Sequence, residues 1–233
     1  MHRFFAVAAV AAVPCALAHF AHAETIYAQL PSPGSAAISL AAPTSGFAFA
    51  NRRRADNFAV ANPVEIQTIT FWGGDESSDP SVPLSNINGF NLEIYDGSGG
   101  SPGSVLYSMT FSKSDFDITS AGLIVGLLNA PMFRFDLDLP ASIDLDAGEY
   151  FFSVGATLNN PVSFTTEAFQ WAGSLPGDGI FFSDSFDGNG YQPLPGAART
   201  NYAFEFSGVI IPTPTTIAAL AIGGLFAARR RRA

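Results

Sequence analysis

The stretch MFRFDLDL, from Met132 to Leu139, decides the fold class of this 233-residue chain. Its apolar residues alternate one by one with Arg134, Asp136 and Asp138. Successive side chains of a β-strand point to opposite faces, so this alternation places one face in a core and the other in solvent. The stretch therefore predicts an amphipathic strand in a sheet that is buried on one side.

The same alternation recurs along the chain between segments rich in glycine. Clear cases are Gly89–Asp96, Tyr150–Thr157 and Tyr202–Ser207, and weaker ones are Glu65–Trp72, Val105–Phe111, Leu123–Leu128, Val162–Thr166, Ala168–Trp171 and Gly179–Phe182. Turn segments follow at 96–103, 146–148 and 187–190, where Gly supplies positive φ and Pro presets a turn. About ten short strands with such connections predict an all-β fold, either an antiparallel two-sheet sandwich or a jelly roll.

The composition excludes several classes of protein. Hydrophobic residues make up 48% of the chain and charged residues 13%, and phenylalanine occurs 22 times. Soluble domains average roughly 25% charged residues, and disordered chains or coiled coils contain more charge and fewer aromatics. Acidic residues outnumber basic ones by 20 to 11, so we expect no nucleic-acid partner, because an acidic surface repels phosphates.

The N-terminus has the pattern of a secretory signal peptide that forms a short apolar helix. Its parts are a positive start, an apolar run and an A-x-A cleavage site, at His2-Arg3, Phe4–Leu17 and Ala21-His22-Ala23. Residues 1–23 are therefore expected to be removed, so that the mature chain begins at Glu24. The alternatives are a buried N-terminal helix and a lipoprotein anchored through Cys15, whose neighbours Val13 and Pro14 make a poor lipidation motif.

Removal of that signal limits the chemistry of the mature protein. The predicted β-domain, residues 24–211, has 188 residues, six of them basic and twenty acidic, for a net charge of −14. The only cysteine and all three histidines lie within residues 1–23. Ser-His-Asp triads, Cys-His triads and zinc sites of His and Cys are then impossible. We therefore expect a protein that is not an enzyme and that needs no cofactor. Calcium stays open as an alternative.

Carboxylates leave one catalytic alternative open. Asp136 with Asp138, and Asp144 with Asp146, have a spacing that places each pair on one face of a strand. A glycoside hydrolase needs only two acids at a suitable separation. The competing interpretation is the solvent face of an amphipathic strand.

Two loops rich in oxygen ligands raise the question of calcium, which binds several oxygen atoms, often from loops. The first contains Asp184, Asp187 and Asn189 in the segment DSFDGNG, which departs from the EF-hand pattern. The second contains Asp75, Glu76 and Asp79. Each loop is either a calcium site or a plain turn.

Aromatic residues near polar or glycine-rich segments suggest sugar stacking. Trp72, Trp171 and Tyr191 are the candidates, because a ring with a polar edge suits a surface that is partly apolar and partly wet. Core packing is the alternative for the tryptophans. The basic cluster Arg52–Arg54 is either a solvated segment before a strand or a contact for an anionic polymer.

The C-terminus has three consecutive parts. They are the motif Pro212-Thr213-Pro214, the apolar stretch Ile217–Ala228, and the cluster Arg229-Arg230-Arg231-Arg232. Twelve residues of helix span roughly 18 Å, short of the roughly 30 Å hydrocarbon core, so this helix is a marginal anchor. The arginines are expected to stay cytoplasmic by the positive-inside rule.

This tail, residues 212–233, resembles the PEP-CTERM sorting signal of exported bacterial proteins, with Thr213 in place of the usual glutamate. The resemblance implies processing near the motif by an exosortase, a membrane protease-transpeptidase, after transient anchoring in the inner membrane. It further implies delivery to the cell surface or to an extracellular polysaccharide matrix. Residues 56–208 are similar to the β-sandwich domains that often precede this tail. An ordinary tail anchor is the alternative.

Three functions therefore compete. The first is a non-enzymatic surface or matrix protein that associates with exopolysaccharide through its β-sandwich. The second is a polysaccharide hydrolase that uses a carboxylate pair. The third is a structural or adhesion protein without a sugar ligand.

Overall fold

The computed structural model describes residues 23–41, 52–75, 84–125, 130–159, 168–175, 178–193 and 201–212. Within these ranges the chain is all-β, as predicted, with fourteen strands and one short 3-10 turn, η1 (Lys113–Asp115). The described part contains no helix long and apolar enough to cross a membrane. The predicted signal helix and C-terminal hydrophobic helix lie outside the described residues.

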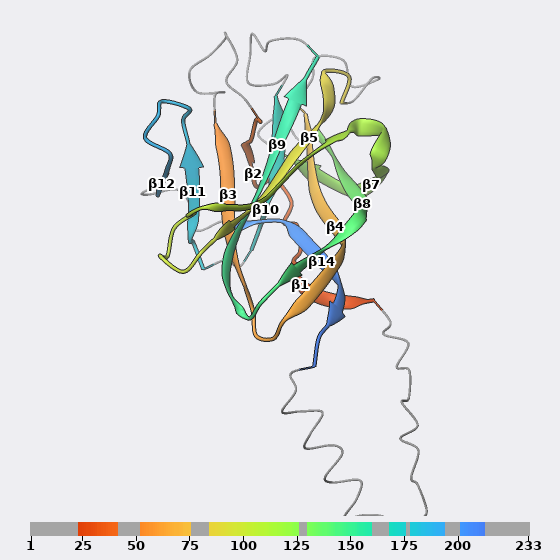
Figure 1. The fold of residues 1–233 in the computed structure, drawn as a ribbon. Helices are drawn as coiled ribbons and strands as arrows, with labels where there is room; N and C mark the ends of the chain where they lie inside the picture. The colour runs from red at the N-terminus through yellow and green to blue at the C-terminus, as the bar shows by residue number, and fades with distance from the viewer. Residues whose placement is uncertain are drawn as a thin grey trace, which may run out of the picture.

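The strands form two antiparallel sheets that face each other as a β-sandwich (Figure 1). The six-stranded sheet contains, in spatial order, β12 (Tyr191–Pro193), β11 (Phe181–Asp184), β3 (Arg53–Val60), β9 (Gly148–Leu158), β5 (Ile87–Asp96) and β6 (Val105–Ser112). The predicted turn at 96–103 connects β5 to β6 as a hairpin.

The eight-stranded sheet is built around β4 (Val64–Asp75), which pairs along both sides. One path contains β1 (Glu24–Gln29), β14 (Phe204–Ile210), β4, β10 (Phe169–Ser174) and β13 (Asn201–Tyr202), with β2 (Ala36–Ile38) paired to β10. On its other side β4 pairs with β8 (Ala130–Leu145), which pairs with β7 (Asp117–Val125). The turn at 146–148 joins β8 to β9 and so carries the chain from one sheet to the other.

The stretch from Met132 to Leu139 lies inside β8, and its alternation has the predicted effect. Phe135 and Leu137 are buried, while Asp138 is exposed. The strand then continues beyond the prediction, because Ile143 and Leu145 resume the buried row. Residues 139–142 of β8 lie opposite the single residue Gln67 of β4, so β8 has a large bulge there. Pro140 lies in this bulge, where its missing N–H costs no ladder hydrogen bond.

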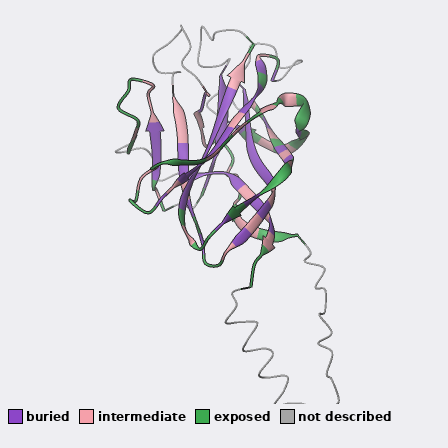
Figure 2. Cartoon of the chain, in the orientation of Figure 1, coloured by how far each residue is buried: buried purple, intermediate pink, exposed green. Residues whose placement is uncertain are grey.

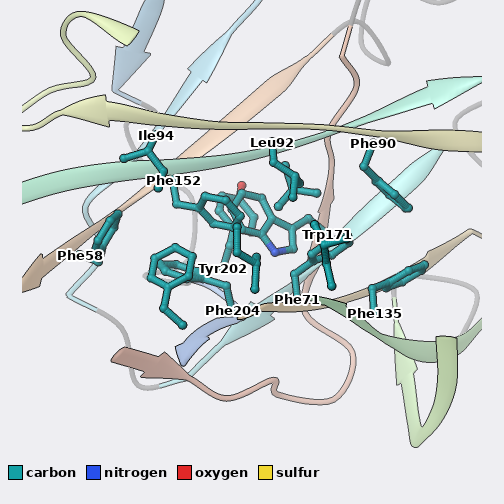
Figure 3. Packing of buried hydrophobic residues seen from close by; sticks show 14 of the residues in the cluster. Phe58, Phe71, Phe90, Leu92, Ile94, Phe135, Phe152, Trp171, Tyr202 and Phe204 are labelled. Atoms are coloured by element: carbon teal, nitrogen blue, oxygen red, sulfur yellow. The ribbon is translucent and has the colours of Figure 1, made fainter. Parts of the chain in front are cut away.

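Phenylalanine rings fill the space between the sheets (Figure 3). Phe71 of β4 stacks on its cross-strand partner Phe135 with ring centroids 4.9 Å apart. Phe90, from the opposite sheet, makes a T-shaped contact with Phe71, with ring centroids 5.0 Å apart. Phe152 and Phe204 make a second contact across the sandwich at 5.1 Å. Aromatic pairs add roughly 0.5–1.5 kcal/mol each beyond their buried area, so the high phenylalanine content builds this core. Figure 2 shows the burial concentrated in the strands.

Several predicted strands have other bounds in the structure, and one lies outside the described residues. The strand predicted over Leu123–Leu128 is β7, which begins earlier, at Asp117, and residues 126–129 lie outside the described part. The stretch predicted over Val162–Thr166 also lies outside it. The alternation of Tyr202–Ser207 holds, since Tyr202, Phe204 and Phe206 all face the core, but the strand is divided at Ala203, whose N–H donates to the Ala172 carbonyl. Tyr202 therefore pairs with β10, whereas β14 pairs with β4.

Candidate functional site on the outer face of the six-stranded sheet

Polar and aromatic side chains gather on the outer face of the six-stranded sheet, away from the core. They come from neighbouring strands, because Ser153 of β9 lies opposite both Ala55 of β3 and Glu93 of β5. We call five of them the outer-face cluster: Arg53, Glu93, Tyr95, Ser153 and Tyr191. The alternation that buries Phe90, Leu92 and Ile94 of β5 is what turns Glu93 and Tyr95 to this face.

Glu93 is the centre of this cluster. Its Oε2 atom accepts hydrogen bonds from Arg53 Nη1 at 2.5 Å and from the Tyr95 hydroxyl. Its Oε1 atom accepts one from Ser108 Oγ, on β6, at 3.2 Å. Three donors on three strands therefore hold one carboxylate in place, and charge-assisted bonds of this kind are about twice as strong as neutral ones.

Arg53 is held from three sides. It forms an ion pair with Glu93, and the side chains retain only 18% and 10% of their exposure. Its Nη2 atom donates to the Ala41 carbonyl, and its guanidinium lies 5.5 Å from the ring centre of Phe186. A guanidinium over an aromatic ring gains cation–π attraction. The prediction that Arg53 lies in a solvated segment before a strand is wrong, because Arg53 begins β3 and its charge has a carboxylate partner across the sheet.

Tyrosine hydroxyls extend the network toward β12. The hydroxyls of Tyr95 and Tyr191 lie 3.2 Å apart, and Tyr191 donates to Ser153 Oγ at 3.1 Å. Burial raises the pKa of Tyr191 to about 12, and burial together with the neighbouring Tyr191 and Glu93 raises the pKa of Tyr95 further. Both phenols therefore stay neutral at physiological pH and keep their protons as hydrogen-bond donors.

Apolar and aromatic residues pack around the cluster on the outer face of the sheet. Ala55, Tyr95, Phe151 and Phe182 form a small buried group on the same face, against which Tyr191 packs. The rings of Phe151 and Phe182 meet edge to face at 5.2 Å. This packing fixes the positions of the polar groups on a rigid sheet rather than on loops.

The loop between β11 and β12 forms the rim of the cluster and carries a strained residue. Phe186 has a backbone φ of +56°, a left-handed conformation that bulky side chains rarely adopt. Its N–H donates to Asp184 Oδ1 at 2.8 Å, which closes the turn. Residues held in such conformations cost roughly 1–3 kcal/mol and concentrate at binding sites. The strain places the Phe186 ring beside Arg53.

The structure distributes the three predicted stacking residues differently. Trp171 is 0% exposed, packs between Phe152 and Tyr202 at 5.9 Å and 4.7 Å, and donates its indole N–H to the Ala203 carbonyl. It is therefore a core residue with no ring face open to a ligand, which corrects the stacking prediction. Trp171 shares one face of β10 with Phe169, and both belong to the core between the sheets.

Trp72 and Tyr191 lie on outer faces of different sheets. Trp72 is 6% exposed, and the Arg134 guanidinium lies 5.7 Å from its ring centre. The arginine therefore occupies the position that a sugar ring would need. Tyr191 alone belongs to the outer-face cluster, half-buried at the rim.

The predicted calcium loop, with Asp184, Asp187 and Asn189, coincides with the same rim. Each carboxylate closes its own turn, since Asp187 Oδ1 accepts the Asn189 N–H at 3.0 Å as Asp184 accepts that of Phe186. Hydrogen bonds from Asn189 lower the pKa of Asp187. In the described part of the chain, no group of three or more acidic, histidine or cysteine side chains is placed to hold a metal ion. Calcium binding at this loop stays a prediction.

The second oxygen-rich loop begins at Asp75, the last residue of β4. Asp75 Oδ1 accepts the N–H of Leu84 at 3.0 Å, and burial raises the pKa of this carboxyl. Glu76 and Asp79 lie outside the described residues.

The carboxylate pairs proposed for hydrolysis lie on the other sheet. Asp136 accepts from Thr70 at 2.6 Å and from Arg134 at 2.9 Å, and Asp138 accepts from Thr68 at 3.0 Å. The two threonine bonds join β4 to β8, and the Arg134–Asp136 bond joins neighbours on one face of β8. All three lie on an outer sheet face, which is the alternative that the sequence left open. Asp144 and Asp146 are exposed near the β8–β9 turn.

The ends of the domain lie at neighbouring positions. Glu24 of β1 pairs with Gly208 of β14, and in Figure 1 the two strands lie together at the lower end of the sandwich. The predicted cleavage residue Ala23 and the motif residue Pro212 are both exposed. The remaining predicted processing residues, Ala21, Thr213, Pro214 and Arg229 to Arg232, lie outside the described part.

Three members of the cluster, Glu93, Tyr95 and Ser153, were not among the residues predicted from sequence, and Arg53 was named only within the basic cluster Arg52–Arg54. The alternation along Gly89–Asp96 already places Glu93 and Tyr95 on one face of a strand. A charged and an aromatic residue side by side on that face could have indicated the cluster. A scan of the chain against protein-family models and a search of curated proteins found no match.

Proposed function

We propose that this chain is an exported, non-enzymatic protein of the cell surface or extracellular matrix. It binds polysaccharide through the outer face of its six-stranded sheet. The observation that carries the proposal is the strained Phe186, whose ring lies at the rim beside the Arg53–Glu93 pair. Strain of this kind persists only where the surrounding structure enforces it.

The groups at this rim suit a sugar chemically. Aromatic rings bind the apolar faces of sugars, while guanidinium, carboxylate and hydroxyl groups bond their hydroxyls. Phe186 and Tyr191 are half-buried, so part of each is open to solvent. The acidic net charge of the domain favours a neutral or cationic polymer over a strongly anionic one.

The neighbouring ends of the domain support export and tail processing. Because β1 and β14 are antiparallel partners, a signal peptidase acting after Ala23 and a sorting protease acting near Pro212 would both work at one end of the sandwich. The same arrangement would let a C-terminal anchor hold the domain by that end until processing by an exosortase-type enzyme.

A binding experiment tests the proposal. The chain beginning at Glu24 and ending at Ile211 is titrated with polysaccharide from the producing cells. Phe186→Gly removes the ring while keeping the positive φ, and should weaken binding at least tenfold with no loss of melting temperature. Tyr107→Phe is the control, because it removes a hydroxyl that bonds the Asp144 carbonyl, away from the cluster.

Three outcomes would contradict this proposal. Equal binding by the wild type and Phe186→Gly would move the ligand away from the outer-face cluster. No binding of any polysaccharide by the wild type would leave the structural or adhesion role, and the release of reducing ends would indicate a hydrolase.

A further inference from the structure

The edge strands of the two sheets differ in how they are protected. Unpaired strand edges invite pairing with other chains, and proteins blunt them with short strands, charge, proline or bulges. In the described part of the chain such protection is present at β1, β2, β7, β12 and β13. Three of these strands are short: β2 and β12 have three residues each and β13 has two, and β12 ends at Pro193. The other two carry charge and a bulge. β1 begins at Glu24 and has a bulge at Ile26, and β7 begins at Asp117 and has a bulge after Ser120.

The edge strand β6 has one of these features, a bulge at Leu106 near its start, and lacks the others. Its eight residues, VLYSMTFS, contain no charge, no proline and no glycine. Among the described residues it pairs only with β5, so its other edge has no strand partner there. Val105 and Leu106 are 51% and 45% exposed at the start of this strand. A long, uncharged and partly apolar edge is suited to strand addition.

We propose that β6 pairs with the β6 of a second copy of this chain, antiparallel about a two-fold axis, so that two six-stranded sheets join edge to edge. Such an isologous contact needs a surface that is complementary to itself. The domain carries a net charge of −14, so two copies repel each other over most of their surface. β6 has no charged residue, and its self-pairing therefore sets no like charges opposite each other.

The side-chain rows of β6 fit this pairing. Tyr107, Met109 and Phe111 face the core but remain half-buried at the side of the sandwich, and Leu106, Ser108 and Thr110 face outward. An antiparallel two-fold pairing keeps each row beside its own copy. With Met109 on the axis, Tyr107 of one copy lies opposite Phe111 of the other, a cross-strand aromatic pair that completes the burial of both.

A cross-linking experiment on the full chain in the producing cells tests the pairing. In a Cys15→Ser background, Thr110→Cys adds one outward-facing thiol on β6. With Met109 on the axis this thiol lies diagonally from its copy, about 7–8 Å away, within reach of a short bis-maleimide cross-linker. Gln192→Cys, exposed on the protected edge strand β12, is the matched control. The cross-linker should give at least ten times more covalent dimer from Thr110→Cys. Equal yields, or no dimer from Thr110→Cys, would overturn the proposal.

A charge substitution provides a second test that needs no cross-link. Thr110→Lys places like charges near the axis and should raise the dimer dissociation constant of the exported protein at least tenfold by sedimentation equilibrium. Thr119→Lys, exposed on β7, should leave that constant and the melting temperature unchanged. A wild-type protein that stays monomeric at the highest concentration reached would refute the pairing. Glycan binding does not enter either test, so failure of the proposed function leaves the result readable.

Discussion

The backbone N–H of Tyr202 donates a hydrogen bond of 2.5 Å to Oδ2 of Asp56, and this bond links the two sheets through a fully buried carboxylate. Oδ1 of the same carboxylate accepts the N–H of Asn57 at 3.0 Å. Asp56 lies on β3 and faces the interior beside Phe58, whereas Tyr202 belongs to β13 of the other sheet. A buried charge is costly unless it is bonded, so this residue has a structural role that its position predicts.

Replacement of Asp56 by alanine should destabilise the domain by about 3 kcal/mol, because the Tyr202 N–H and the Asn57 N–H lose their acceptor in a buried site. Chemical denaturation measures this difference. Asp56→Asn keeps the shape and one acceptor oxygen, and it should cost clearly less than alanine. Because asparagine keeps the packing, equal losses for the two variants would contradict the expectation that its remaining acceptor oxygen preserves part of the hydrogen bonding.

The contribution of Asp56 to the stability of the domain should fall as the pH rises above the acidic range. Burial, only partly offset by the two backbone donors, raises the pKa of Asp56 well above 3.8. The folded state then binds a proton that the unfolded state has released. The contribution of Asp56 is therefore complete below about pH 4 and is lost as the pH rises through the folded-state pKa.

The difference in unfolding free energy between wild type and Asp56→Asn, followed from pH 4 to pH 8, measures this loss. Histidine is absent from residues 24–211, so the usual titrating group in this range does not contribute. Asp75→Asn is the control for the other buried carboxyl with a raised pKa. A difference that stays flat or increases with pH would contradict the assignment to Asp56.

Glu93→Gln should destabilise the domain by about 2 kcal/mol, because it leaves the enclosed Arg53 guanidinium without its counter-charge. The matched control is Asp136→Asn, which breaks the Arg134–Asp136 pair, whose side chains are 45% and 26% exposed. That loss should be under about 1 kcal/mol, as is usual for exposed pairs. Urea denaturation compares the two variants, and similar losses would mean that the outer-face cluster adds no special stability.

Gly73→Ala should be among the most damaging single substitutions, at about 3 kcal/mol or more. A Cβ atom at this position would lie 2.4 Å from the Phe169 ring and 2.5 Å from the Gln170 carbonyl, both on the neighbouring strand β10. Overpacking of this kind forces backbone shifts. Gly99→Ala is the control, because a Cβ atom there meets open space. Equal melting temperatures for the two variants would contradict this close packing.

The alternating strands could be predicted from sequence because the signal is local. A period of two along Gly89–Asp96 or Met132–Leu139 requires one buried face whatever the partner strand is. β1 and β2 had no such signal, since their residues are exposed or half-buried edge positions. The bulge of β8 at residues 139–142 depends on its register with β4 and was equally hidden.

The candidate site depends on strand order, which is not local. Arg53, Glu93 and Tyr191 come from β3, β5 and β12, and β9 lies between β3 and β5 in the sheet. No spacing in the chain indicates that 40 residues of separation bring Arg53 within 2.5 Å of Glu93. Trp171 shows the opposite error, because its polar neighbours in sequence suggested a surface while its strand face points to the core.

The last prediction concerns both ends of the chain. The exported protein should begin at Glu24, the first residue of β1, because that strand pairs with β14 from its first position and leaves Ala23 exposed for cleavage. Its C-terminus should lie near Pro212-Thr213-Pro214. Loss of the four terminal arginines would change the net charge from −10, with ten basic and twenty acidic residues, to −14. Intact mass and isoelectric focusing of material from outside the cells and from membranes measure both changes.

Deletion of Pro212 to Pro214 should leave the unprocessed form in the inner membrane, because the apolar stretch would hold it there and the arginines oppose passage by roughly 2.5–3.5 kcal/mol each at the helix centre. Arg229 to Arg232 changed to neutral residues should weaken that retention. Wild-type protein found only in membranes, with residues 212–233 intact, would show that the tail is a permanent anchor and not a sorting signal.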